Sequence, residues 1–208
     1  MGMFCYQCQE ASKGTGCTVR GVCGKTEDVA KLQDLLIYTL KGISEIIVKG
    51  KLRAENLGHI NHEVLNSLFM TITNANFDGE AIELEIKKMI KVRDELREKI
   101  NVNTLHDAAV YEIESRDSML DKAAAVGVLS TQNEDVRSLR ELITYGVKGL
   151  AAYTHHALNI GKENAKLYAF IYEAMAATLN DELTADDLVA LVLKTGEFGV
   201  IAMALLDE

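Results

Sequence analysis

The fold of this chain is decided by the stretch DVAKLQDLLIYTLKGI at residues 28–43, which returns as DVRSLRELITYGVKGL at residues 135–150. The two stretches align without a gap, and the Asp-Val start, the tyrosine and the Lys-Gly pair are the same in both. In each, apolar residues recur at intervals of three and four, the period of an amphipathic α-helix. We therefore interpret the chain as an internal duplication of a helical unit.

Two further helical patterns follow each of these stretches. In the first copy the sequence predicts helices over residues 26–50, 61–75 and 78–100. In the second copy it predicts helices over residues 133–159, over residues 162–179 and from residue 184 onward. The expected boundary residues are the N-caps Thr26 and Asp78, the closing Gly50, and a capping box formed by Thr184 and Asp187. Three amphipathic helices are the smallest set that buries a continuous core, so the pattern predicts two three-helix bundles.

The remaining segments complete the predicted organisation. A cysteine loop occupies residues 1–25, the first bundle residues 26–100, a helical connector residues 101–132 and the second bundle residues 133–208. Within the connector we expect short helices over residues 105–112 and 116–125. The extra Met1-Gly2 before Met3 and the abrupt stop of an apolar helix at Asp207-Glu208 suggest one N-terminal domain of a longer protein.

Composition limits the class of protein. The 208 residues contain no Pro and no Trp, and the absence of Pro is typical of a helical chain. The net charge of -9 argues against a nucleic acid or an anionic membrane surface as partner. We find neither a signal peptide nor an apolar run that we take as long enough to span a bilayer, so we expect a cytoplasmic, all-α protein.

All four cysteines lie within the first 23 residues, at Cys5, Cys8, Cys17 and Cys23. Paired disulfides are typical of short secreted chains, which this chain does not resemble. A zinc site is favoured by the close pair Cys5 and Cys8, but the five residues between Cys17 and Cys23 are atypical for zinc. Zinc therefore stays open as an alternative.

An iron-sulfur cluster is the interpretation that the loop favours. Four thiolates in a short segment suit soft iron, and backbone N–H groups of such a loop can donate to sulfur. The glycines around the thiols allow positive φ angles and a close approach of the backbone to a bulky cluster. They are Gly14, Gly16, Gly21 and Gly24.

The loop also carries a resemblance to a known family. The segments are MFCYQCQE at residues 3–10, GCT at 16–18 and GVCGK at 21–25, followed by LST at 129–131, DVRSLREL at 135–142 and KG at 148–149. They closely resemble the opening of the hybrid cluster protein family, also called prismane protein or hydroxylamine reductase. The resemblance covers essentially the whole chain.

This resemblance implies an N-terminal domain of two roughly perpendicular three-helix bundles that carries a cubane 4Fe-4S cluster. Cys5, Cys8, Cys17 and Cys23 match the family's four ligand positions, with the compact spacing of its anaerobe-type members. Longer-spaced relatives carry a 2Fe-2S centre, which is the alternative cluster type. In the family this cluster passes electrons to a hybrid iron-sulfur-oxygen cluster, where hydroxylamine or nitric oxide is reduced.

The resemblance also limits what this chain does alone. The hybrid cluster takes histidine, glutamate and further cysteine ligands from later domains, and all four cysteines of this chain are already assigned. We therefore expect an electron-transfer unit that is not catalytic by itself. Its expected partners are the remaining hybrid-cluster domains and a redox donor protein, with homodimerisation through uncovered apolar faces. The alternative function is a zinc-stabilised helical interaction module.

Several other residues have both a functional and an ordinary interpretation. Tyr6, Gln7 and Gln9 could tune a cluster or simply pack, and Arg20 and Lys25 could offset its charge or be solvated cations. His155 and His156 are adjacent on a helix and are expected to be ordinary histidines, because they do not face one metal together. The repeated pairs Tyr38 and Tyr145, and Lys41-Gly42 and Lys148-Gly149, are expected to be structural, with the glycines allowing close helix packing.

Overall fold

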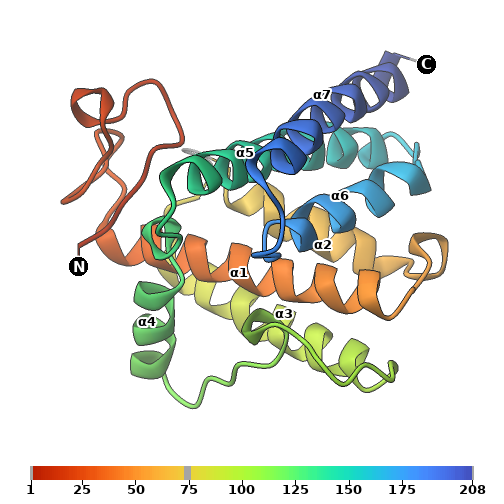
Figure 1. Cartoon of the computed structure of the whole chain (residues 1–208), viewed down its shortest axis with the longest axis horizontal. Coiled ribbons are helices and arrows are strands. Elements are labelled where there is room, and N and C mark those ends of the chain that lie inside the picture. Colours follow the sequence, from red (N-terminus) through yellow and green to blue (C-terminus); the bar gives the residue numbers. More distant parts are fainter. Residues whose placement is uncertain (1, 73–75, 208) are drawn as a thin grey trace.

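The computed structural model describes residues 2–72 and 76–207. In these residues the chain is built from α-helices joined by loops and short 3-10 turns, and it contains no strand, which confirms the all-α prediction. The helices are α1 (Glu27–Lys49), α2 (His59–Met70), α3 (Gly79–Arg97), α4 (Arg116–Ala125), α5 (Glu134–Asn159), α6 (Ala165–Ala177) and α7 (Ala185–Asp207). Figure 1 shows the cysteine loop beside the N-terminal ends of α1 and α5.

Most of the expected helix starts are formed by side-chain caps. The Asp78 carboxylate accepts a hydrogen bond from the Ala81 N–H at the start of α3. Thr184 and Asp187 exchange the two hydrogen bonds of a capping box at the start of α7. Thr26 occupies the N-cap position of α1, but its side chain makes no capping hydrogen bond. Local capping chemistry therefore accounts for α3 and α7 more directly than for α1.

The connector differs from the sequence prediction. The helix expected over residues 105–112 is only a 3-10 turn, Asp107–Ala109. The His106 N–H donates to the Glu45 carboxylate, and His106 Nδ1 accepts from the Ala108 N–H, so these side chains satisfy backbone groups that a longer helix would use. The second expected helix of the connector is present as α4.

Other boundaries also shift by a few residues. The helix predicted over 61–75 begins at His59 and ends at Met70, and residues 73–75 lie outside the described part of the chain. The third helix stops at Arg97 rather than near residue 100. The sixth begins at Ala165 rather than 162, because Gly161 has a left-handed φ of 78° and the Asn164 side chain caps the helix.

The two copies of the repeat share one hydrophobic core. α1 packs chiefly against α3 and α6, and α5 packs chiefly against α7 and α2. α6, the second helix of the second copy, therefore lies mainly on α1, and α2, the second helix of the first copy, lies mainly on α5. Figure 1 shows α6 and α2 between α1 and α5. The division into bundles at 26–100 and 133–208, and the duplication behind it, stay predictions from the sequence.

A close backbone contact fixes the connector against α1. A Cβ atom on Gly42 would lie 2.1 Å from the carbonyl oxygen of Ala108. The guanidinium of the fully buried Arg93 donates to the carbonyl oxygens of Tyr111, at 2.7 Å, and of Ala108, at 3.4 Å. Gly149, the repeat counterpart of Gly42, has no atom within 4 Å of its would-be Cβ apart from its chain neighbours and the nearby backbone of its own helix. The expected close packing thus applies to Gly42 and not to Gly149.

The last helix differs from the sequence prediction in one respect. By length and composition, α7 is long and apolar enough to cross a membrane, whereas no such run is predicted from the sequence. Only 17% of its most apolar segment is buried inside the protein. A single helix of this kind is weak evidence for a membrane span. α7 packs on the bundle through the stacked rings of Phe170 and Phe198, 4.0 Å apart, and through a 2.6 Å ion pair of Lys194 with Glu173.

The glycine pair gives a matched test of the fold. We expect Gly42→Ala to lower the free energy of unfolding by about 1–3 kcal/mol, because its methyl group would overlap the Ala108 backbone. We expect Gly149→Ala to raise it by about 0.5–1 kcal/mol, because alanine is favoured inside a helix with open space. Urea unfolding of both variants measures the difference, and equal effects would contradict the close approach at Gly42.

Candidate functional site

The cysteine loop is organised by a two-residue bridge. Cys5 and Cys17 exchange both backbone hydrogen bonds, Cys5 N–H to Cys17 O at 3.0 Å and Cys17 N–H to Cys5 O at 2.9 Å. In an antiparallel pair of this kind the two side chains project on one face of the ribbon as direct neighbours. The structure therefore brings together two thiols that lie twelve positions apart in the sequence.

A backbone N–H group of the loop also points at sulfur. The Ser12 N–H donates to Cys17 Sγ at 3.4 Å, which is the kind of contact that stabilises a thiolate ligand. The short turn that supplies it is held by the Ala11 N–H, which donates to the Cys8 carbonyl oxygen at 3.2 Å. The loop thus supplies a donor to one of the predicted ligands.

Glycines make this compact course possible. Gly14, Gly16 and Gly24 have φ angles of 66°, 126° and 95°, which L side chains rarely adopt. A Cβ on Gly16 would lie 2.7 Å from the Phe4 ring, and a Cβ on Gly21 would lie 3.0 Å from Cys23 Sγ. The backbone at Gly21 therefore lies close to the Cys23 thiol, and its close approach to a cluster stays a prediction.

The four thiols differ in exposure. Cys17 is buried with Met3 and Ala30, Cys5 and Cys8 are partly buried, and Cys23 is exposed. Burial raises the pKa of the Cys5 thiol, and the nearby Lys25 ammonium lowers it in part. Within residues 2–72 and 76–207, no group of three or more His, Cys, Asp or Glu side chains is gathered closely enough to hold a metal ion. The assignment of all four cysteines to one centre therefore stays a prediction.

A hollow of about 860 Å³ opens between the loop and α5. Cys5, Gln7, Cys8 and Lys25 line it from the loop, and Lys148 lines it from α5. Its other walls include Gln33 and Asp34 of α1 and Arg137, Glu141, Leu142 and Tyr145 of α5. The donor set at its edge is sulfur, which suits iron or zinc better than a hard cation such as calcium.

The two cations predicted near the thiols behave differently. Lys25 is only 1% exposed, and its Nζ donates to Gln33 Oε1 at 2.7 Å. Gln33 is itself held in place because its Nε2 donates to the carbonyl oxygen of Asn76 at 3.0 Å. Arg20 is exposed and donates to the Gly24 carbonyl oxygen at 3.3 Å. Lys25 therefore has the buried position that charge compensation requires, whereas Arg20 is a solvated cation.

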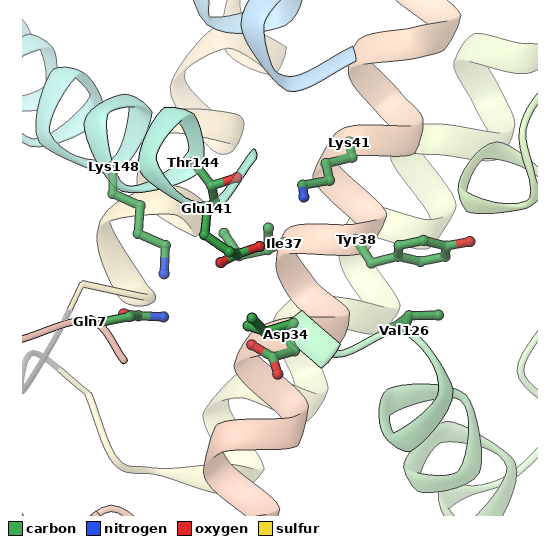
Figure 2. A pocket seen from close by; sticks show the side chains of 10 residues that line it. Gln7, Asp34, Ile37, Tyr38, Lys41, Val126, Glu141, Thr144 and Lys148 are labelled. Atoms are coloured by element: carbon green, nitrogen blue, oxygen red, sulfur yellow. The ribbon is translucent and has the colours of Figure 1, made fainter. Parts of the chain in front are cut away.

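A small charged cavity of about 30 Å³ lies next to the hollow. Figure 2 shows that α1 contributes Asp34 and Lys41, α5 contributes Glu141 and Lys148, and the cysteine loop contributes Gln7. Burial and the nearby Glu141 raise the pKa of Asp34 to about 7. Burial lowers the pKa of Lys148 to about 8, although the Asp34 and Glu141 carboxylates oppose this shift.

Sequence reasoning missed this cavity, although its signal was visible. Asp34 aligns with Glu141 and Lys41 with Lys148 in the repeat, so the same acid-to-lysine spacing occurs on α1 and α5. The recurrence of the lysines in both copies indicates a structural role when the sequence is considered alone. The structure places both lysines at one cavity beside the cysteine loop.

The remaining candidates have ordinary roles or border the hollow. Tyr6 and Gln9 are exposed and line the hollow with Gln7. His155 stacks on the Phe69 ring at 5.1 Å and His156 meets it edge-on at 5.7 Å, which agrees with the expectation of ordinary histidines.

The repeated tyrosines differ between the two copies. The Tyr38 hydroxyl donates to Asp107 at 2.6 Å and so joins α1 to the connector. Tyr145, its counterpart in the repeat, is exposed at the edge of the hollow. A shared structural role therefore does not hold for both.

Comparison with known proteins finds relatives that match the chain over its whole length. A family model described as the Prismane/CO dehydrogenase family matches residues 3–208. The hydroxylamine reductase of Acetivibrio thermocellus is 68% identical over 208 residues, and those of Clostridium perfringens and Desulfitobacterium hafniense are each 49% identical, over 215 and 218 residues. Each match covers 100% of this chain but only 38% or 39% of the relative, so the chain spans about two fifths of their length.

The unequal burial of the thiols predicts an order of chemical modification in metal-free, reduced protein. We expect iodoacetamide to label exposed Cys23 at least about tenfold faster than buried Cys17, because Cys17 must wait for local opening of the loop. Cys5 should also react slowly, since its raised pKa leaves less thiolate. Peptide mass spectrometry over a time course measures the order, and equal rates for Cys17 and Cys23 would contradict the described loop.

Proposed function

Because the chain belongs to the Prismane/CO dehydrogenase family, we propose that it is an iron-sulfur electron-transfer unit whose ligands are Cys5, Cys8, Cys17 and Cys23. It corresponds to the N-terminal part of proteins named hydroxylamine reductase. Family membership supports iron-sulfur binding in general, and the choice of these four thiols is our own.

The observation that carries the proposal is the geometry of the cysteine loop. The bridge sets Cys5 and Cys17 side by side, and an N–H group already donates to Cys17 sulfur. Cys5 and Cys8 open onto a hollow that has room for an inorganic cluster. Sulfur ligands, N–H donors to sulfur and a protected space are the features that such clusters require.

We propose a 4Fe-4S cluster, with 2Fe-2S as the alternative type. When bound, such a group takes up and gives back one electron at a time. Met3 and Ala30 pack around Cys17 and keep water from that ligand, while Phe4 lies against the Gly16 backbone. Lys25 places a buried positive charge beside Cys5, where it favours the thiolate.

We further propose that the parent protein reduces hydroxylamine and that this chain supplies the electrons. Reduction of hydroxylamine to ammonia and water takes two electrons and two protons, so a one-electron relay must act twice in each turnover. The partners are the remaining domains of the parent chain and a redox donor protein, and the proposed location is the cytoplasm. A zinc-stabilised interaction module is the second candidate, favoured by the close pair Cys5 and Cys8.

Metal analysis tests the first part of the proposal. We expect the anaerobically reconstituted protein to be brown and to contain about four iron and four acid-labile sulfide per chain, with an EPR signal when reduced. Replacement of Cys17 by Ser should remove most of this iron and sulfide. Val19→Ala, in the same loop but exposed and without a thiol, should retain both.

The zinc alternative has a different outcome in the same experiment. A colourless protein with one zinc per chain and tetrahedral sulfur ligation would contradict the cluster proposal and support the zinc-stabilised module. Material prepared anaerobically is needed, because zinc can occupy a thiolate site that has lost iron.

Activity assays of the chain by itself test whether it transfers electrons without catalysing the reduction of hydroxylamine. We expect the reconstituted protein to be reduced by viologen and reoxidised reversibly, but not to consume hydroxylamine at the rate of a full-length relative. The physical reason is that all four cysteines belong to the loop and none is left for a second centre. Consumption of hydroxylamine at the rate of a full-length relative would show that the chain contains its own catalytic site.

A further inference from the structure

The region beside the cysteine loop holds an unusual excess of positive charge. Four cations line the hollow or the adjoining cavity, together with three carboxylates: Lys25, Lys41, Arg137 and Lys148, and Asp34, Glu134 and Glu141. Four positive groups against three carboxylates leave one positive charge unbalanced when all are ionised. The chain as a whole is strongly acidic, so this local excess is not a consequence of composition.

Lys148 is the most informative member of this group. Its side chain is 4% exposed, and its Nζ donates to the carbonyl oxygen of Thr71 at 3.2 Å. Among the described residues no carboxylate oxygen lies within 4.0 Å of it. An ammonium group buried without a close counter-ion is costly unless another negative charge lies nearby.

The hollow provides the place for that negative charge. Lys148 lines the hollow together with Cys5 and Cys8. The Asp34 and Glu141 carboxylates favour the charged form of Lys148, and a thiolate at Cys5 would add to their effect. Lys25 lines the same hollow and is likewise buried without a carboxylate within 4.0 Å in the described part of the chain. Two buried cations thus border the space next to two predicted thiolate ligands.

We propose that Lys148 is the buried counter-cation of the iron-sulfur cluster and that its charge raises the reduction potential of that cluster. This inference rests on the proposed function and adds a residue from α5, far from the loop in the sequence. Each electron makes a thiolate-ligated cluster more negative, so a fixed positive charge in a region of low dielectric stabilises the reduced form. Lys148 acts on the cluster through its positive charge and is not one of its ligands.

The internal repeat supplies a matched control. Lys41 occupies the position on α1 that Lys148 occupies on α5, and both line the small charged cavity. Lys41 does not line the hollow that contains Cys5 and Cys8. Loss of charge at Lys41 therefore disturbs the same cavity without removing the cation beside the thiols.

The experiment is a redox titration of the anaerobically reconstituted protein, followed by EPR. We expect Lys148→Met to lower the equilibrium constant for reduction about tenfold, which is a shift of about 59 mV to more negative potential for one electron. Lys41→Met should change it less than about threefold. Lys148→Arg, which keeps the charge, should restore most of the wild-type potential, and circular dichroism checks that each variant is folded.

The outcomes separate this inference from the proposed function. If the wild-type protein takes up no iron and sulfide, the proposed function fails and this inference fails with it. If the wild type holds a cluster but Lys148→Met leaves its potential unchanged, or Lys41→Met shifts it equally, only the role of Lys148 is overturned. If Lys148→Met does not retain a cluster, Lys25→Met provides the second test. The counter-cation model predicts the same negative shift of the reduction potential for this variant, and an unchanged potential would overturn the model.

Discussion

The structure depends on the packing of each repeat's second helix against the first helix of the other repeat. α6 lies on α1 and α2 lies on α5, so neither half buries its apolar faces alone. A core that is shared in this way fixes α1 and α5 relative to each other, because interiors packed to crystal-like density do not deform continuously. The hollow and the charged cavity beside the cysteine loop depend on that fixed relation, because residues of both α1 and α5 line them.

One consequence is the charged cavity between α1 and α5. The acid and the lysine of each repeat point into the same space because the two first helices present equivalent faces to it (Figure 2). In the sequence these pairs are more than a hundred residues apart. The repeated sequence pattern thus coincides, at one end of α1 and α5, with a cluster of charges that one copy of the pattern could not assemble.

The cysteine loop itself has little core of its own. Met3, Cys17 and Ala30 form a small satellite cluster that joins it to α1, and the Lys25–Gln33 hydrogen bond adds a second attachment. Positive φ angles at its glycines let the backbone turn closely around the thiols. Such a loop is suited to a site in which ligand and metal order each other, because metal binding supplies much of the folding free energy of small metal-binding segments.

The sequence by itself determined the all-α class, the order of the helices, the capping of α3 and α7, and the four thiols as the candidate centre. These features depend on residues close together in the chain, through hydrophobic period, capping and spacing. Tertiary structure alone decided that Gly42 meets a neighbouring backbone while Gly149 does not, and that the helix expected at 105–112 reduces to a turn beside Glu45. It also decided that Lys25 is buried while Arg20 is solvated, and that Lys148 borders the thiols while Lys41 does not. Burial and electrostatic environment are set by elements distant in the sequence, so no local pattern could have separated the members of these pairs.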